Sequence, residues 1–429
     1  QGGTGASSRT VENKLQESVS VKDFGAVGDG STDDTTAIQA AVDASDSIYF
    51  PPGTYEFNGI EINGPSTETG AGKYIDASGA YLQDSAADST SMFKISETSA
   101  TNFLVIKAKS ITIASGGGHV FSLLGTLNHS HIDVDYINQN ATTRSIINHS
   151  DTGFFFNRIK GLMWAITPSH TVPAISMSST SNKVSANEFD ILRPDRSGTR
   201  HYMELNSTSG SDFNYHNIIR LSNPERCDGG VLQISRAMNT VIEGMNCFDT
   251  GTTVNDMIEV GLAGYDCKHT VIRDYQRNGG TLGSGKKDIM LTDSNGALIE
   301  NCSGAGSTTI EIDGGSEPNT SVMYSDKANV TNLSTSTGVE LDTSKGLTAP
   351  GLLVTEHSTE LTISAGEITV SASSHYVDTE ANAASDDLAT INGGSPGKVL
   401  IIRASVNSRT VVVKDATGNL RLSGDFSLD

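Results

Sequence analysis

The sequence predicts an all-β protein: a parallel β-helix with a short N-terminal helix cap and a C-terminal β-sandwich-like module. Two strand patterns recur at a nearly constant spacing between about residues 127 and 345, and a short amphipathic pattern precedes them. The composition agrees, because only 18% of the 429 residues are charged and 44 are glycine, which suits stacked turns better than helices. Repeats of about 20 to 50 residues are typical of coils in which each turn packs on the last.

The first recurring strand has an apolar residue at its centre and a polar residue directly after it. The central residues lie 27, 30, 30, 23, 30 and 27 positions apart, at Ile132, Ile159, Phe189, Ile219, Ile242, Ile272 and Ile299. The second strand recurs between them, at Ile147, Ile175, Met203, Leu232, Ile258, Met290, Ile310 and Val339. Because side chains alternate between the two faces of a strand, the apolar columns should face inward and the next residues outward.

The segment from Val21 to Tyr55 predicts a strand, a Gly/Asp turn, a short helix and a second strand closed by a Pro-Pro-Gly turn. Asp33 or Asp34 can accept the free N–H groups at the start of the helix. Apolar residues then share one face of about three helical turns, at Ala37, Ile38, Ala41 and Val42. A helix this short does not persist alone in water, so we expect it to cover the end of the β-rich part that follows.

The same segment carries a family resemblance. The run D-F-G-A-x-G-D-G-x-x-D-D-T-x-A-I-Q-x-A begins at Asp23, and Phe50-Pro51-Pro52-Gly53-Thr54-Tyr55 follows it. These residues resemble the opening of right-handed β-helix proteins of the pectate-lyase superfamily, which in phages begins the tailspikes that bind and cut surface polysaccharide. The resemblance implies a right-handed coil and a homotrimer in the phage tail. It also implies action outside the cell on a bacterial capsule, exopolysaccharide or O-antigen.

The chain is expected to contain four parts, at residues 1–20, 21–60, 61–345 and 346–429. Because the chain opens on Gln1 without an apolar signal segment, we expect residues 1–20 to be a linker from a truncated part that binds the phage baseplate or tail. Residues 21–60 are the helix-capped entry, and residues 61–345 are the coil. The last part has short alternating strands and Gly turns, and it resembles the tailspike modules that join three chains or bind carbohydrate.

Composition excludes several other classes of function. The formal net charge of −21 argues against nucleic acid or an anionic membrane as partner, since both need clustered Lys and Arg. The four cysteines show no C-x-x-C spacing, which favours buried free thiols over a metal site. We therefore expect neither a metal nor another cofactor.

The residues that follow the first strand centres form an outward column whose charge alternates in sign. They are Asp133, Lys160, Asp190, Arg220, Glu243, Arg273 and Glu300. Such alternation is typical of a stabilising charge ladder. A catalytic alternative is that Asp190 and Glu243 flank Arg220 about two rungs, or roughly 9.6 Å, apart, at the upper edge of the spacing in inverting glycosidases. An acid beside Arg has a lowered pKa, however, and is a poor proton donor.

The second outward column has no cation in register. It is predicted to contain Asn148, Ser176, Glu204, Gln233, Glu259, Leu291, Glu311 and Glu340. Glu204 and Glu259 lie about two rungs apart and are candidates for a general acid and a general base, with Gln233 between them to bind a sugar hydroxyl. The alternative is that both are solvated side chains on a polar face.

Two loops contain the densest cluster of Arg, Asp, His and Tyr. They run from Arg193 to Tyr202 and from Asn223 to Asp228, and we expect them to be neighbours on consecutive turns. The candidate substrate-binding residues are Arg193, Arg196, His201, Tyr202, Tyr215, His216, Glu225 and Asp228, together with Gln233 and Arg220 of the two columns. Arg can hold the carboxylates of an acidic polysaccharide, and Tyr offers a face for sugar stacking. Salt bridges within the loops or subunit contacts are the alternative.

The function predicted from these patterns and the resemblance is depolymerisation of a bacterial surface polysaccharide by glycoside hydrolysis. A lyase that acts by β-elimination on a uronate is the first alternative. A receptor-binding or structural tail fibre protein without catalysis is the second.

Overall fold

The computed structural model describes most of the chain, which divides into two compact units, Gln1–Thr343 and Ser344–Asp429. The described residues are 4–15, 17–64, 72–95, 100–150, 152–179, 184–207, 214–248, 252–303, 309–313, 320–323, 329–332, 339–340, 360–372, 374–394 and 399–428. Among them, no helix is both long and apolar enough to cross a membrane.

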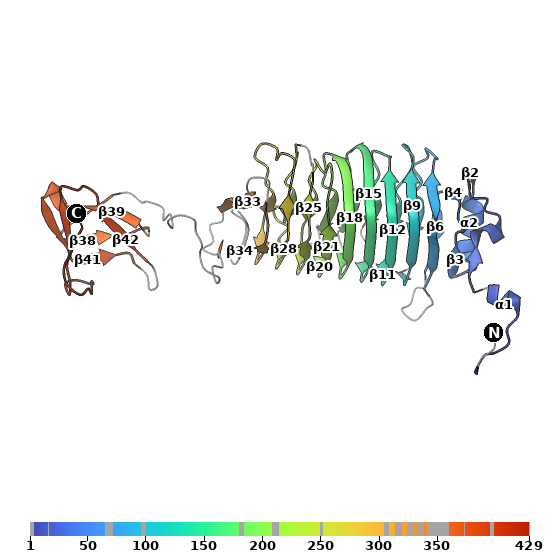
Figure 1. The fold of residues 1–429 in the computed structure, drawn as a ribbon, viewed down its shortest axis with the longest axis horizontal. Helices are drawn as coiled ribbons and strands as arrows, with labels where there is room; N and C mark the ends of the chain where they lie inside the picture. Colours follow the sequence, from blue (N-terminus) through green and yellow to red (C-terminus); the bar gives the residue numbers. More distant parts are fainter. Residues whose placement is uncertain are drawn as a thin grey trace. The chain divides into compact units, whose positions relative to one another are not determined.

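The first unit opens with short elements, and those after α1 close one end of a coil (Figure 1). They are α1 (Val11–Leu15), β1 (Val19–Ser20), a 3-10 helix (Val21–Phe24), β2 (Asp29–Asp33), α2 (Thr35–Ala44), β3 (Ser47–Tyr49) and β4 (Thr54–Glu56). The 3-10 helix stands where a strand was predicted. Ser20 and Asp23 cause this difference, because each side chain accepts a backbone N–H at the start of this helix and so forms a capping box.

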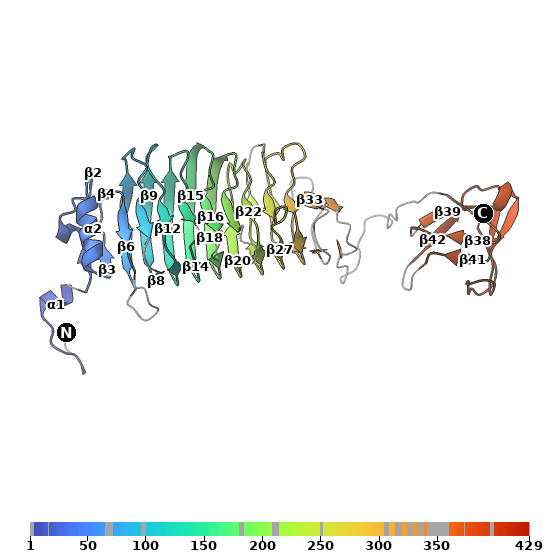
Figure 2. The ribbon, with the colours of Figure 1, turned by 180° about the vertical axis from the view of Figure 1, so that it is seen from behind.

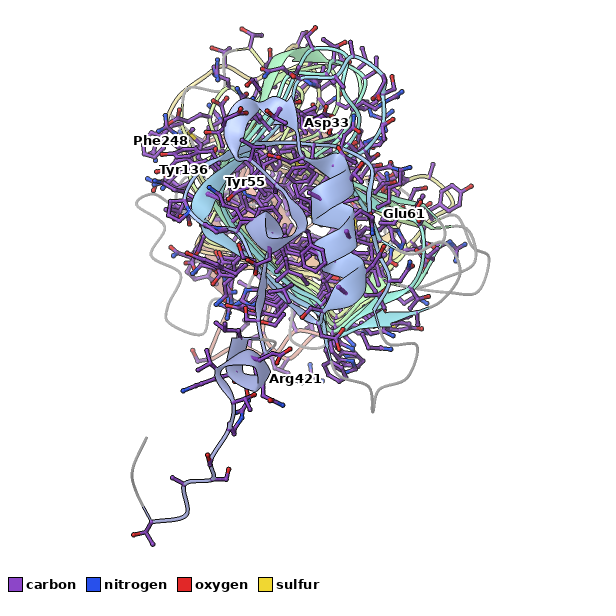
Figure 3. The ribbon with its side chains drawn as sticks, turned by 90° about the vertical axis from the view of Figure 1, so that its right-hand side faces the viewer. Asp33, Tyr55, Glu61, Tyr136, Phe248 and Arg421 are labelled. Atoms are coloured by element: carbon purple, nitrogen blue, oxygen red, sulfur yellow. The ribbon has the colours of Figure 1, made fainter. Side chains whose placement is uncertain are left out.

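Helix α2 lies where the sequence predicts it and covers the end of the coil beside Tyr55 (Figure 3). Its buried residues are Ile38, Ala41 and Val42, three of the four predicted for that face. Asp33 accepts the Thr35 N–H at 2.9 Å. At the other end, the buried Lys73 amine donates to the carbonyl oxygens of Val42 at 2.6 Å and Ser45 at 2.9 Å. A cation at the C-terminal end of a helix is favourable, so Lys73 joins the cap to the coil.

The body of the unit is a parallel β-helix with three faces. The first sheet continues from β1 and β3 through β6 (Tyr74–Asp84), β9 (Val105–Ile113), β12 (His131–Gln139), β15 (Arg158–His170), β18 (Glu188–Gly198), β21 (Ile218–Leu221), β24 (Val241–Glu243), β28 (Val271–Arg273), β32 (Leu298–Glu300), β34 (Thr320–Met323) and β36 (Val339–Glu340). The second contains β5 (Ile60–Ile62), β7 (Phe93–Ile95), β10 (Phe121–Leu123), β13 (Ile147–Ser150), β16 (Ile175–Ser179), β19 (Met203–Ser207), β22 (Leu232–Ile234), β26 (Ile258–Val260), β30 (Ile289–Leu291), β33 (Thr309–Ile312) and β35 (Asn329–Asn332). Every strand pairing within the described part of these two sheets is parallel.

The third face consists of two-residue strands along one edge of the coil, several of which are labelled in Figure 2. They are β8 (Thr101–Asn102), β11 (Leu127–Asn128), β14 (Phe154–Phe155), β17 (Val184–Ser185), β20 (Asn214–Tyr215), β23 (Ala237–Met238), β27 (Cys267–Lys268) and β31 (Ser294–Asn295). A further short pair joins β25 (Asn246–Cys247) and β29 (Gln276–Arg277).

The predicted register of the first strand is confirmed. All seven central residues, from Ile132 to Ile299, are buried and stand opposite one another on consecutive rungs. The second column is correct as far as Glu259, but the next residue in register is Met290, and Leu291 is buried. Val339 was also misplaced, since β36 belongs to the first sheet.

A residue with positive φ occupies the turn between the third sheet and the first on eight consecutive rungs. These residues are Phe103, His129, Phe156, Ala186, His216, Asn239, His269 and Gly296. The residue after three of them is a buried asparagine: Asn157, Asn187 and Asn217. The side-chain oxygen of each asparagine accepts the backbone N–H of the equivalent residue one rung earlier, at 2.9 to 3.1 Å. This asparagine ladder holds the turn in the same conformation from rung to rung.

The interior is apolar, and all four cysteines are buried thiols, as predicted. Trp164 is also fully buried, and its indole N–H donates to the Val134 carbonyl at 2.8 Å.

The second unit differs from the predicted β-sandwich in its strand pairing. Its elements are β37 (Leu361–Thr362), β38 (Glu367–Thr369), β39 (Ser374–Asp378), a 3-10 helix (Glu380–Asn382), β40 (Ser385–Leu388), β41 (Thr390–Asn392), β42 (Ile401–Ala404), β43 (Thr410–Val413) and β44 (Phe426–Leu428). Strands β37, β39 and β42 pair in parallel, as do β38 with β41 and β40 with β43. Only β43 and β44 form an antiparallel pair within the described strands. A sandwich is antiparallel, whereas this arrangement is a second short coil around its own core.

Candidate functional site

The second sheet brings Glu204, Gln233 and Glu259 into one outward column, on strands β19, β22 and β26. The Gln233 amide donates to the Glu259 carboxylate at 2.6 Å, and its oxygen accepts a hydrogen bond from Asn206 at 3.0 Å. Burial raises the pKa of Glu259, although the hydrogen bond from Gln233 lowers it. A carboxyl group with a raised pKa is suited to donate a proton near neutral pH.

Glu204 has a different environment from Glu259. The guanidinium of Arg200, four residues earlier, makes two hydrogen bonds to its carboxylate, and the Nε to Oε1 distance is 2.7 Å. From Ser176 to Glu259, the described residues in register in this column include no cation, as predicted, but a cation from outside the register reaches Glu204. Register alone misses Arg200, because this residue lies in the loop before β19 and not on a strand.

A pocket of about 220 Å³ lies beside this ion pair. Its lining includes Arg200, Glu204 and Asn206 of one rung and Ser176 and Pro173 of the rung before. The Arg200 side chain is 50% exposed whereas that of Glu204 is only 6% exposed. The Arg200 guanidinium therefore presents a positive charge to solvent at the pocket, whereas the Glu204 carboxylate that it pairs with is buried.

The first column has the structure of a charge ladder. Arg220 lies between Glu188, at 2.5 Å from Nη1, and Glu243, at 2.7 Å from Nε. Arg273 bonds the second oxygen of Glu243 from the next rung at 2.6 Å. Burial raises the pKa of Glu243, but the two guanidiniums outweigh it and hold that pKa below its usual value. Asp190 is in register with Arg220, yet Arg220 forms its ion pairs with Glu188 and Glu243.

The two predicted loop segments are neighbours, as expected. An isolated parallel bridge pairs Asp195 with Glu225, and the Gly198 N–H donates to Asp228 at 2.9 Å. Arg193 pairs with Glu225 at 2.5 Å, and Arg226 forms two hydrogen bonds to Asp195. Arg193 and Arg226 therefore bond to carboxylates of the adjacent loop, which agrees with the alternative of salt bridges within the loops. The Arg196 side chain lies outside the described part of the chain.

The aromatic and histidine residues predicted to bind substrate differ in how deeply they are buried. Tyr202 is fully buried, and its hydroxyl donates to the Trp164 carbonyl at 3.1 Å, so it offers no face to a sugar. His201 is 2% exposed and bonds the Asp256 carbonyl through Nε2 at 2.9 Å. Both were expected at the surface, but they point inward at the start of the second-sheet strand. Tyr215 is half-buried and His216 is exposed, at the turn between the third sheet and the first.

Comparison with known proteins finds a family match in the N-terminal part of the chain. Residues 18–122 match the family described as Rhamnogalacturonase A/epimerase, pectate lyase-like. This segment is therefore similar to pectate-lyase-like proteins. It contains the cap and the first turns of the coil, and it ends before Glu204 and Glu259.

Individual curated relatives match only a short part of the chain. Alginate lyase 7 of Azotobacter vinelandii is 57% identical over 44 residues, 9% of this chain and 5% of that protein. The pre-neck appendage protein of Bacillus phage phi29 is 39% identical over 66 residues, 15% of this chain and 8% of that protein. The chain therefore spans less than a tenth of the length of either curated relative.

Among solved structures, ORF18 of Geobacillus virus E2 superimposes with a TM-score of 0.51 at 16% identity. The match covers 75% of this chain and 63% of that one. At this identity the likeness concerns the fold, and it agrees with the right-handed β-helix expected for a pectate-lyase-like protein.

No group of three or more His, Cys, Asp or Glu side chains in the described ranges is arranged to hold a metal ion. The candidate chemistry in this part of the second sheet is that of Glu204, Gln233 and Glu259, together with Arg200 from the loop before β19.

Proposed function

We propose that the chain is the polysaccharide-depolymerising part of a phage tailspike, with Glu259 as general acid and Glu204 as general base. The observation that supports this most is the pairing of two differently held glutamates in one outward column beside a pocket. The likeness to a phage appendage protein and to a viral β-helix supports the assignment to a phage tail.

In this mechanism a glycosidic bond lies across the rungs of Glu204 and Glu259. Glu259, whose pKa is raised by burial, donates a proton to the leaving oxygen. Glu204, ion-paired with Arg200, takes a proton from a water molecule on the opposite face of the sugar. Two rungs separate the carboxylates by roughly 9.6 Å, which favours inversion over retention at the anomeric carbon.

The assembly follows from the same proposal. The chain acts as a homotrimer outside the cell, at the host surface, and joins the baseplate or tail through a segment before the cap. The second unit serves trimerisation or carbohydrate binding.

A lyase is the second candidate, and Arg200 is the observation that favours it. A half-exposed guanidinium at a pocket can hold the carboxylate of a uronate while a base removes the neighbouring proton. The short match to an alginate lyase agrees with such a substrate. Cleavage with ultraviolet absorbance from an unsaturated uronate identifies a lyase, and new reducing ends without that absorbance identify a hydrolase. Binding with neither signal identifies a non-catalytic receptor-binding protein.

The decisive experiment compares three glutamates of one column. Glu204→Gln and Glu259→Gln are expected to lower cleavage of a purified capsular polysaccharide at least a hundredfold, the usual loss for a proton-transfer residue. Glu311→Gln is the matched control, because Glu311 lies in the same column but pairs with Lys287 at 2.8 Å. It should leave cleavage unchanged.

Proton nuclear magnetic resonance of the first product tests inversion. Wild-type rates in both Glu204→Gln and Glu259→Gln would refute the assignment. Asp190→Asn and Glu243→Gln, made in the same series, test the other carboxylate pair predicted from the sequence.

A further inference from the structure

An exposed stack of aromatic rings follows the turn between the third sheet and the first. The Phe103 and His129 rings lie 5.3 Å apart, and the His129 and Phe156 rings lie 4.9 Å apart with only 10° between their planes. Phe103 is 36% exposed and Phe156 is 59% exposed. Each ring belongs to a residue with positive φ on consecutive rungs, so the turn repeats the ring position along the coil.

The stack has a gap at the next rung. Ala186 takes the equivalent position with the same positive φ, and His216 restores a ring on the rung after it. An open hollow of about 400 Å³ lies there, and it is lined by Phe156, Arg158, Ala186, Glu188 and His216 among others. One face of Phe156 packs on His129, and its other face turns toward this hollow.

The width of the gap indicates what fits inside it. Phe156 and His216 are two rungs apart, which places equivalent positions roughly 9.6 Å from each other. A flat ring in van der Waals contact on both faces needs about 7 to 8 Å. A puckered pyranose ring with axial hydrogens is thicker than a flat ring and fills the remaining space.

The rim of the gap supplies polar groups for such a ring. The Arg158 and Glu188 side chains are 49% and 32% exposed, and their ion pair is 3.3 Å long. Charged donors and acceptors at this distance can exchange part of their mutual contact for hydrogen bonds to sugar hydroxyls. Phenylalanine has no hydroxyl and tyrosine has one, whereas a pyranose ring carries several, so the rim favours a sugar.

We propose that the slot between Phe156 and His216 binds one pyranose ring of the polysaccharide, as a subsite separate from Glu204 and Glu259. The slot lies at the corner of the third and first sheets, whereas the glutamates lie on the second sheet. This proposal depends on the proposed function only in naming a polysaccharide as the ligand. Stacking on a held aromatic ring retains the polymer while cleavage proceeds elsewhere.

The test fills or empties the slot and measures binding of defined probes. Oligosaccharides of alginate, polygalacturonate, dextran and cellulose are titrated into the whole chain, and binding is followed by saturation-transfer nuclear magnetic resonance and by the His216 ring shifts. Ala186→Trp places a ring in the gap at a turn position that already accepts Phe and His, and should weaken binding at least tenfold. Phe156→Ala removes one wall and should weaken binding severalfold, which keeps the test valid if Ala186→Trp fails to fold.

His269→Ala is the matched control, because His269 is an exposed ring at the same turn beyond the slot. It should bind as the wild type does. Unchanged binding in both Ala186→Trp and Phe156→Ala would overturn the subsite, as would failure of all four probes to bind the wild type. Cleavage by the Glu204→Gln and Glu259→Gln variants judges the proposed function separately, since the slot variants leave both glutamates in place.

Discussion

The asparagine ladder permits a quantitative prediction for Asn187→Ala. The Asn187 side chain is 2% exposed and makes four hydrogen bonds. Its oxygen accepts the backbone N–H of Asn157 at 2.9 Å and the Asn157 amide at 3.1 Å. Its nitrogen donates to the Phe154 carbonyl at 2.9 Å and to the Asn217 amide oxygen at 3.1 Å.

Truncation to alanine affects these groups unequally. The Asn157 amide still donates to Leu127, and the Asn217 oxygen still accepts the Asn187 N–H. The Asn157 N–H and the Phe154 carbonyl each lose the partner that Asn187 provides. An unsatisfied buried polar group costs about 1 to 3 kcal/mol, so the free energy of unfolding should fall by about 4 kcal/mol.

The chain itself supplies the matched control. At Ser130, on the same ladder, the hydroxyl accepts the Leu104 N–H at 3.0 Å and donates to the Asn128 carbonyl at 2.8 Å. Asn187→Ser should therefore keep an acceptor for Asn157 and lose about half as much, near 2 kcal/mol. Urea unfolding gives both differences, and hydrogen exchange should accelerate at the Asn157 amide in the alanine variant. A loss below 1 kcal/mol for alanine, or equal losses for alanine and serine, would refute the account of the ladder.

Three further predictions concern buried titratable groups. Asp288→Ala leaves Arg277, which is 7% exposed, without the carboxylate that lies 2.7 Å from its Nε. The free energy of unfolding in urea should therefore fall by about 3 to 5 kcal/mol, and a loss below 1 kcal/mol would contradict this. Burial raises the pKa of Asp84 from 3.8 to about 6, so its stabilisation is complete below pH 3.8 and is lost as pH rises through 6. The free energy of unfolding of Asp84→Asn should therefore exceed that of the wild type by about 2 kcal/mol at pH 7 and be similar to it at pH 4, as measured in urea. A lower free energy of unfolding at pH 7 would exclude this. Burial raises the pKa of Cys267 and Cys302 to about 12. A disulfide reagent should therefore label neither thiol in the native protein and both thiols in urea. Rapid labelling of the native protein would show that the thiols are accessible.

The sequence predicted the register of the coil because one physical cause acts on every rung. An apolar residue such as Ile159 or Ile272 must face inward, so its successor faces outward, whatever the length of the intervening loop. The prediction fails at Leu291 because Met290 and Leu291 form an apolar pair, which leaves the alternation ambiguous, whereas Ile289 is the residue that pairs with the inward Ile258. It also failed for the second unit, since alternation within short strands does not distinguish parallel from antiparallel pairing.

The sites were harder to predict than the fold because their chemistry comes from loops. Glu204 and Glu259 occupy equivalent positions on strands two rungs apart, so strand register alone does not distinguish their environments. Arg200, which comes from a loop, holds the first glutamate, and Gln233, which comes from the rung between them, holds the second. The surroundings of each carboxylate therefore depend on polar side chains that the apolar repeat does not specify. The slot at Ala186 is also a departure from the repeat. The regular turn presents one side chain per rung, and a single small residue creates the opening. A β-helix thus provides a fixed array of positions, and departures from the repeat are where binding and catalysis should be sought.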